Sequence, residues 1–210
     1  MIRVIALSAS ALALSGCISL LPEPPPPPRL YTMEAGEVAR AEGAPVDAVL
    51  GVSQPGGERT LLGGDLVWRT GDTLAFVAES QWSTRAEEAL QAMVVQTIQA
   101  QGRFRAAVRV GDARNDYALR WDVVDFEVVE ADMTARFVVD AMLLAPGRRV
   151  IAAERISAEA PVSDRSSSVA AQALTRAARE ASARMGLFAA DAASQEEARA
   201  AAQRAEEGRN

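Results

Sequence analysis

The chain has 210 residues, a formal net charge of −6, a single cysteine and no histidine. Without histidine, Ser-His-Asp and Cys-His catalysis and the usual zinc sites are excluded, because histidine is the commonest general base and metal ligand. The acidic balance disfavours nucleic-acid binding, which depends on cationic groups that neutralise phosphates. We therefore expect no cofactor, no metal ion and no nucleic-acid partner.

An uncharged apolar run opens the sequence after Arg3. Its length of about 11 residues is too short to cross a bilayer, which takes roughly 20, but suits a secretory signal peptide. The run ends in a quartet that resembles the lipobox of bacterial lipoproteins: Leu14, Ser15, Gly16 and Cys17. We predict a signal peptide over residues 1–16 and lipidation of the Cys17 thiol. The alternatives are a plain signal peptide with an incidental cysteine, or a buried thiol.

A lipidated tether is predicted over residues 17–29. Two or more acyl chains anchor a protein stably, and bacterial lipoproteins carry three. Ile18 and Ser19 follow the cysteine in place of an aspartate, which by resemblance to the Gram-negative sorting rule favours the outer membrane, facing the periplasm. The following proline run favours a polyproline II stalk that reaches roughly 40 Å from Cys17 to Leu30. A ligand for a proline-recognising module is the alternative.

Residues 30–190 predict one α+β periplasmic domain. Alternating apolar residues and glycine-containing turns predict strands at residues 29–33, 46–52, 66–69, 73–77, 104–110, 117–128, 133–144 and 150–158. Residues 54–65 are glycine-rich and predict a loop. The alternation changes phase after Val123, which indicates a β-bulge or burial of both faces. The last three strands predict a meander.

Two helices complete the predicted domain. The first opens at a capping box, Thr84 to Glu87, and ends at Gly102. The second begins near Ser163 and Asp164, and its alanines permit close approach to a sheet. Residues 191–210 hold no large apolar side chain and predict a frayed or disordered tail. The expected fold is a small, mixed, mostly antiparallel sheet with two helices on one face.

Two groups of side chains are candidates for function. Trp68, Phe76 and Trp82 lie around the predicted hairpin and helix start, where they form either core or a contact site for a partner or lipid. Core is the favoured interpretation for Phe76 and Trp82, and Trp68 is left open. The strand carboxylates are the best candidates for an enzyme, but they fit the solvated side of a half-buried strand better: Asp122, Asp125 and Glu127. We therefore expect no enzymatic activity.

The ordered motifs resemble the ABC-type transport auxiliary lipoproteins, the family that includes the paraquat-inducible lipoprotein PqiC. The resemblance covers residues 17–190 and rests on the anchor and stalk followed by Tyr31-Thr-Met33, Trp82 at a helix start, Asp116-Tyr-Ala-Leu119, Phe126 and an alanine-rich last helix. Met33 stands where the family usually has leucine, and the glycine-rich loop at 54–65 departs from the family pattern.

The resemblance implies a non-enzymatic outer-membrane lipoprotein. It would work with an ABC permease and a periplasmic MCE-domain protein, such as MlaD, to move phospholipid or another lipid across the envelope. The resemblance also leaves a homo-oligomer open. The alternative function is an envelope assembly or scaffold lipoprotein that binds a periplasmic or outer-membrane protein.

Overall fold

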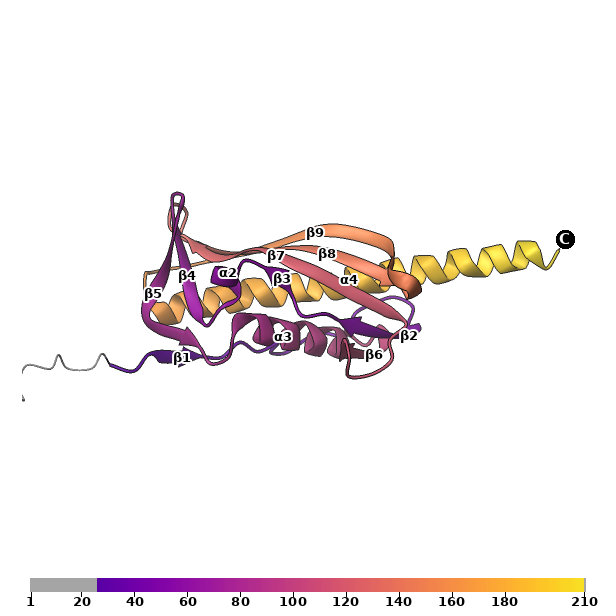
Figure 1. Cartoon of the computed structure of the whole chain (residues 1–210), viewed down its shortest axis with the longest axis horizontal. Coiled ribbons are helices and arrows are strands. Elements are labelled where there is room, and N and C mark those ends of the chain that lie inside the picture. Colours follow the sequence, from indigo (N-terminus) through magenta and orange to yellow (C-terminus); the bar gives the residue numbers. More distant parts are fainter. Residues whose placement is uncertain (1–25, 210) are drawn as a thin grey trace, which may run out of the picture.

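A computed structural model describes residues 26–209, and its centre is one mixed sheet of nine strands (Figure 1). The strands are β1 (Arg29–Tyr31), β2 (Val46–Val52), β3 (Gly56–Gly57), β4 (Asp65–Thr70), β5 (Thr73–Trp82), β6 (Phe104–Arg109), β7 (Tyr117–Val129), β8 (Thr134–Ala145) and β9 (Arg149–Pro161). The helices are α2 (Arg59–Leu62), α3 (Ala86–Gln101), the 3₁₀ turn η2 (Pro146–Arg148) and α4 (Ser167–Glu207). The predicted signal peptide, the lipobox and Cys17 lie outside the described residues.

Strand β7 is the centre of the sheet. Along one edge it pairs in parallel with three strands in turn, with β2 at Leu119, β3 at Val123 and β4 at Val128. Along its other edge it pairs antiparallel with β8, which pairs antiparallel with β9. β6 extends the sheet beyond β2, and β5 and β1 extend it beyond β4. The predicted meander is confirmed, and the longest pairings are antiparallel.

The predicted irregularity in β7 is confirmed. The register against β8 shifts between Val123 and Asp125, and Val124 is left exposed. Beyond the shift, the consecutive residues Phe126 and Glu127 are both buried, so both faces of the strand are covered there. The expectation that Glu127 is solvated is therefore wrong, because the face that carries it is covered once the strand passes the bulge.

Helices α3 and α4 lie side by side against the sheet, as expected (Figure 1). Gly102 ends α3 in the left-handed conformation at φ 67°, which confirms the predicted cap. The predicted capping box is wrong, because the N-cap residue is Arg85 and its side chain makes no capping bond. The backbone N–H of Ala86 instead donates to the carbonyl of Gly63 at 2.8 Å, so the residue that ends α2 satisfies the first exposed amide of α3.

Helix α4 is longer than the sequence pattern predicts. It begins after Ser166 and runs to Glu207, through the residues expected to be frayed or disordered. Ala193 is fully buried, and the Glu196 carboxylate pairs with Arg149, so packing extends beyond residue 190. Alanine has the highest helix propensity, and an existing helix lengthens at little cost once it has nucleated. The expectation of a frayed or disordered tail is therefore wrong for residues 191–207, which continue α4.

The segment predicted as a loop over residues 54–65 contains two short elements. Gly56 and Gly57 form β3 against Asp122 and Val123 of β7, and α2 follows with its leucines buried. A Cβ at Gly56 would lie 2.0 Å from Asp122 Oδ1, so the absence of a side chain allows this close pairing. The sequence does not predict this strand, because two glycines show no alternation of apolar and polar side chains.

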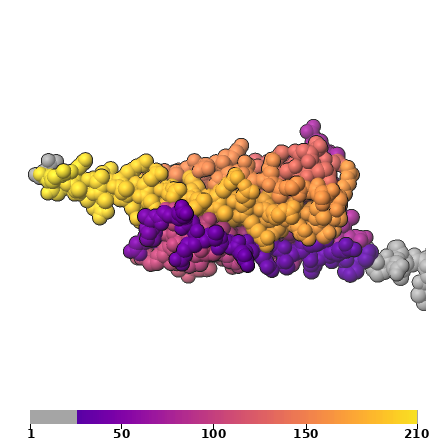
Figure 2. Space-filling view, turned by 180° about the vertical axis from the view of Figure 1, so that it is seen from behind, coloured from indigo at the N-terminus to yellow at the C-terminus, as the bar shows by residue number. Residues whose placement is uncertain are grey.

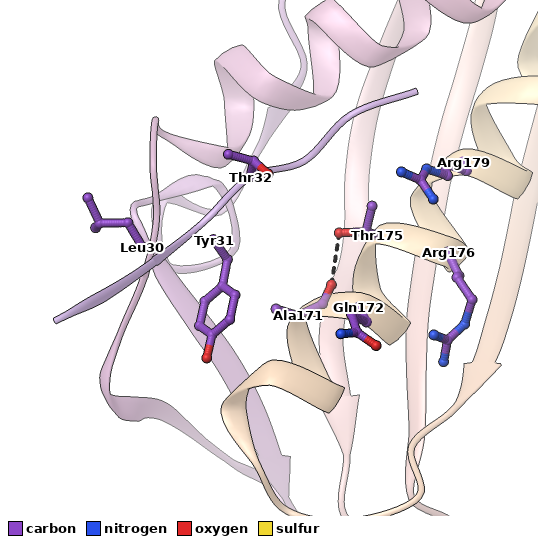
Figure 3. A pocket seen from close by; sticks show the side chains of 8 residues that line it. All are labelled: Leu30, Tyr31, Thr32, Ala171, Gln172, Thr175, Arg176 and Arg179. Carbon is purple, nitrogen blue, oxygen red and sulfur yellow. Dashed lines mark hydrogen bonds between the residues drawn. The ribbon is translucent and has the colours of Figure 1, made fainter. Parts of the chain in front are cut away.

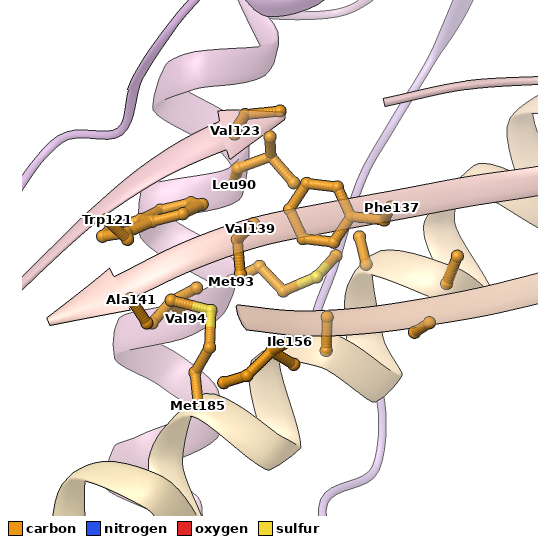
Figure 4. Packing of buried hydrophobic residues seen from close by; sticks show 14 of the residues in the cluster. Leu90, Met93, Val94, Trp121, Val123, Phe137, Val139, Ala141, Ile156 and Met185 are labelled. Carbon is orange, nitrogen blue, oxygen red and sulfur yellow. The ribbon is translucent and has the colours of Figure 1, made fainter. Parts of the chain in front are cut away.

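The core lies between the sheet and the two long helices (Figure 4). Phe126 and Phe137 meet edge to face at 5.3 Å between ring centroids. Trp121 is buried in the same cluster, and its indole N–H donates to the Ser53 carbonyl at 3.0 Å. Met185 of α4 closes the core from the helix side (Figure 4). Among residues 26–209, no helix is long and apolar enough to cross a membrane.

The molecule is elongated, and the two ends of the described chain lie far apart (Figure 1). The chain enters β1 at the end from which the β4–β5 hairpin projects, whereas the C-terminal turns of α4 extend from the opposite end (Figure 1). Seen from behind, α4 runs along the surface with the N-terminal segment beside it (Figure 2). The hairpin therefore lies at the end where the predicted tether joins the domain.

Candidate functional site

The β4–β5 hairpin forms an arm that projects beyond the rest of the sheet (Figure 1). Thr70 pairs with Thr73 across a two-residue turn, in which Gly71 has a φ of 58°. A two-residue hairpin turn favours glycine because it requires a positive φ that other residues rarely adopt. The predicted hairpin and its turn are thus confirmed.

The arm exposes apolar side chains along its surface. Phe76 is 59% exposed, so its expected place in the core is wrong. Trp68 is half-buried and packs partly against the core, and it lies opposite Ala75 in the pairing of the two strands. Phe76 lies on the part of β5 that no further strand covers, because β1 pairs with β5 only from Ser80 to Trp82. Together with Val77, these residues form what we call the hairpin patch: Trp68, Ala75, Phe76 and Val77.

Trp82 is not part of this patch. It is 4% exposed and stacks on Phe126 with 5.8 Å between the ring centroids, so the favoured core interpretation is confirmed for this residue. It occupies the last position of β5, where the strand returns to the core before α3. The structure therefore brings together two of the three aromatic candidates, Trp68 and Phe76, and assigns the third to the core.

A shallow hollow of about 250 Å³ lies at the hairpin patch. Besides the patch residues, it is lined by Thr70, Glu130 and Arg165. The Glu130 carboxylate pairs with the Arg165 guanidinium, so the rim contains both signs of charge. An apolar, aromatic centre with a polar rim is the composition of a protein contact surface.

An ion pair between a partly exposed arginine and a buried carboxylate fixes the arm to the sheet. Arg69 of β4 binds the Glu127 carboxylate through two hydrogen bonds, and the bond from Nη2 to Oε2 measures 2.9 Å. The hydrogen bond to Glu127 raises the pKa of the Arg69 guanidinium, so the group stays charged. The backbone N–H of Glu130 also donates to the Arg69 carbonyl at 2.9 Å. Because Arg69 lies next to Thr70 at the turn and pairs with Val129, these bonds hold the turn end of the hairpin on the end of β7.

The carboxylates of β7 do not assemble into a catalytic pair. Glu127 is occupied by Arg69, Asp122 is exposed beside Gly56, and Asp125 is half-exposed. Within residues 26–209, no three histidine, cysteine, aspartate or glutamate side chains are placed to hold a metal ion. The arrangement of these carboxylates fits a structural role, in which Glu127 anchors the hairpin.

The sequence did not predict a groove that lies between β1 and α4 (Figure 3). It brings Tyr31 beside the first turn of α4, where the Tyr31 hydroxyl and the Ser167 hydroxyl are 2.8 Å apart. These residues are 136 positions apart in the chain, so no local pattern reveals their contact. The only local sign is the spacing of Arg176 and Arg179, which places two cations on one face of the helix.

The order of these elements defines an α+β domain that is built on one mixed sheet of nine strands and carries a projecting hairpin arm. The chain belongs to the family of ABC-type transport auxiliary lipoprotein components, whose model matches residues 31–186. This family is named as an auxiliary component of transport and not as a catalytic one. An auxiliary role in transport therefore follows from membership of the family.

Two solved structures share the fold. A protein from Xanthomonas campestris has a TM-score of 0.73 at 22% identity, and the match covers 80% of this chain and 98% of that one. The second, a crystal structure of an uncharacterized protein, has a TM-score of 0.62 at 14% identity and covers 78% and 99% of the two chains. At these identities the likeness concerns the fold alone. No curated protein matches the sequence.

Proposed function

We propose that the protein is held at the periplasmic face of the outer membrane by a lipidated Cys17. There it serves an ABC permease and a periplasmic MCE-domain protein in the transport of lipid. The auxiliary role in transport comes from the family. The lipobox-like quartet and the absence of an aspartate after Cys17 support the anchor and its membrane.

The observation that carries the proposal is the exposed hairpin patch at the end where the tether joins the domain. Nine peptide steps separate Cys17 from Pro26, and a polyproline II chain of that length spans roughly 28 Å. A domain held on such a tether stays close to the bilayer but can present its arm to a second protein. The domain acts by binding, without chemistry of its own.

A protein partner fits the hairpin patch better than the bilayer does. Attraction to an anionic lipid surface needs an excess of basic residues around the apolar side chains. Around the patch, Arg165 is paired with Glu130, and Asp72 and Glu79 add negative charge to the same hairpin. Aromatic side chains surrounded by charges of both signs are typical of a protein interface. We therefore assign the patch to the MCE-domain protein.

The test compares pull-downs of the full lipidated protein from detergent-solubilised envelopes. We expect the unaltered protein to recover an MCE-domain protein, and Phe76→Ser to lose it. Val150→Ser is the matched control, because Val150 is a similarly exposed residue of β9, at 54%. If Phe76→Ser recovers as much MCE-domain protein as the unaltered protein does, the proposed contact through the hairpin patch is contradicted. Recovery of an envelope assembly protein in place of a transporter component favours the scaffold alternative.

A second experiment tests the anchor. We expect Cys17→Ser to accumulate as uncleaved precursor without a fatty-acid label, because the thiol is the nucleophile that takes up the diacylglycerol before cleavage. Density-gradient separation of the two membranes should place the unaltered protein with the outer membrane. A Cys17→Ser protein that is cleaved and retained normally contradicts the predicted lipobox.

A further inference from the structure

The groove between β1 and α4 has features that the proposed function does not use. Its volume is about 480 Å³, and it runs between the N-terminal segment and the exposed face of α4 (Figure 3). We call it the β1–α4 groove and define it by the side chains that matter here: Leu30, Tyr31, Thr32, Gln172, Arg176 and Arg179. It lies next to the strand that continues from the predicted tether.

Two arginines border the groove without acidic partners. Arg176 Nη2 donates to the Pro161 carbonyl at 3.0 Å, and Arg179 Nε donates to the Glu34 carbonyl at 2.7 Å. Among residues 26–209, no carboxylate oxygen lies within 4.0 Å of either guanidinium. Arg184, further along the same helix, pairs instead with Glu180 at 2.5 Å. The groove thus contains two uncompensated cations in a chain that is acidic overall.

Both guanidinium groups keep donors for a ligand. A guanidinium has five N–H donors, and the backbone bonds above use one donor of each arginine. The position of Arg179 is further restricted, because a Cβ at Gly36 would lie only 3.1 Å from its Cζ atom. The chain at Gly36 therefore closes tightly over this guanidinium. A cation held in this way is arranged before a ligand arrives, which reduces the entropy lost on binding.

The remaining residues suit the other parts of an amphiphilic ligand. Thr32 and Gln172 add uncharged polar groups to the lining, and the Tyr31 hydroxyl is already paired with Ser167. Leu30 is 63% exposed and contributes apolar surface. The groove therefore offers charge, hydrogen bonds and an apolar contact within a short distance of one another.

We infer that the β1–α4 groove binds a phosphate group through Arg176 and Arg179, with an anionic lipid headgroup as the ligand that carries it. Arginine is suited to phosphate because its planar fork makes two charge-assisted hydrogen bonds to adjacent oxygens. This inference goes beyond the proposed function, because the site would bind a headgroup whether or not an MCE-domain protein contacts the hairpin patch.

The test is a titration of the full lipidated protein in micelles of an uncharged maltoside detergent. The probes are dihexanoyl phosphatidylglycerol, inorganic phosphate and dihexanoylglycerol, which has the same acyl chains without phosphate. Isothermal titration calorimetry should show saturable binding of the phosphatidylglycerol. We expect Arg176→Gln and Arg179→Gln each to weaken it about tenfold or more, since each removes charge-assisted hydrogen bonds. Arg184→Gln is the matched control and should leave it unchanged.

Each outcome decides the inference. If inorganic phosphate binds as tightly as the phosphatidylglycerol and both arginine variants weaken its binding, the groove is a phosphate site. That result overturns the lipid headgroup as its ligand. Equal binding of dihexanoylglycerol, or affinity indifferent to both arginine variants, overturns the site itself. If a variant does not fold, the amide NMR spectrum of the unaltered protein locates the bound phosphatidylglycerol. The inference is overturned if the amide signals of Thr32 and Gln172 do not move when the lipid is added. The pull-down result for Phe76→Ser is independent of all of these.

Discussion

Arg69 and Glu127 form a two-point ion pair that joins the projecting hairpin to the central strand of the sheet. The Arg69 side chain is 33% exposed, whereas that of Glu127 is 1% exposed, so the pair is buried from the carboxylate side. Burying a carboxylate is costly unless a cation and hydrogen bonds compensate it. The position of the hairpin patch therefore depends on an ion pair between β4 and the central strand β7.

Removing the arginine of this pair should destabilise the fold. Arg69→Ala leaves a buried carboxylate without its partner, and we expect the free energy of unfolding to fall by about 2–4 kcal/mol. Urea denaturation measures the loss. The matched control is Arg155→Ala, because Arg155 also binds a carboxylate, that of Asp140, through two hydrogen bonds but at the surface. Equal losses for the two variants would contradict a special role for burial.

The two aromatic residues of β5 should respond in opposite ways to truncation. Trp82→Ala removes a buried ring that stacks on Phe126, and we expect a loss of about 3–5 kcal/mol in unfolding free energy. Phe76→Ala removes an exposed ring and should change stability by no more than about 0.5 kcal/mol. Thermal unfolding of both variants checks the difference. A large loss on Phe76→Ala would show that the ring packs against the domain in solution.

Gly186 allows α3 and α4 to approach closely. A Cβ at this position would lie 2.0 Å from Gln101 Oε1 and 3.0 Å from Ile98 Cγ1, both on α3. Gln101 is buried and donates to the Ala183 carbonyl at 2.8 Å, so it has little freedom to move aside. We expect Gly186→Ala to cost about 1–2 kcal/mol of unfolding free energy, despite the better helix propensity of alanine.

Two further variants test the cause of that loss. Gly64→Ala is the control, because a Cβ there meets no atom within 4 Å, and stability should stay nearly unchanged. Adding Gln101→Ala to Gly186→Ala should recover part of the loss, since the clashing side chain is gone. Chemical denaturation of the unaltered protein, Gly186→Ala, Gln101→Ala and the double variant gives the coupling between the two positions. If the changes in unfolding free energy of the two single variants add up to that of the double variant, the clash is not the cause of the loss.

The acid limb of the stability curve should depend on Asp140. The hydrogen bond from Arg155 holds the pKa of the Asp140 carboxyl below its ordinary value of 3.8 in the folded protein. The stabilisation is therefore present above pH 3.8 and is lost as the pH falls through the lower folded pKa. Asp140→Asn should show a shallower loss of stability in this acid range. If stability falls equally steeply with pH in the two proteins below pH 3.8, the pairing of Asp140 with Arg155 in solution is contradicted.

Much of the fold could be predicted from local patterns in the sequence. The meander of β7, β8 and β9 follows from long alternating segments separated by turns, and the bulge after Val123 follows from the change of phase. Gly102 and Gly71 mark a helix end and a hairpin turn because each takes a positive φ that glycine accepts without strain. These features depend on residues close together in the chain, so the sequence alone determined them.

The candidate sites depended on contacts between distant segments. Whether Phe76 is exposed and Glu127 buried depends on where the long helices and neighbouring strands end, which no pattern within β5 or β7 states. Similarly, the β1–α4 groove exists because the chain after the tether folds back along a helix far downstream. Only the tertiary structure decided these points, because burial and the pairing of charges depend on which surfaces meet in space.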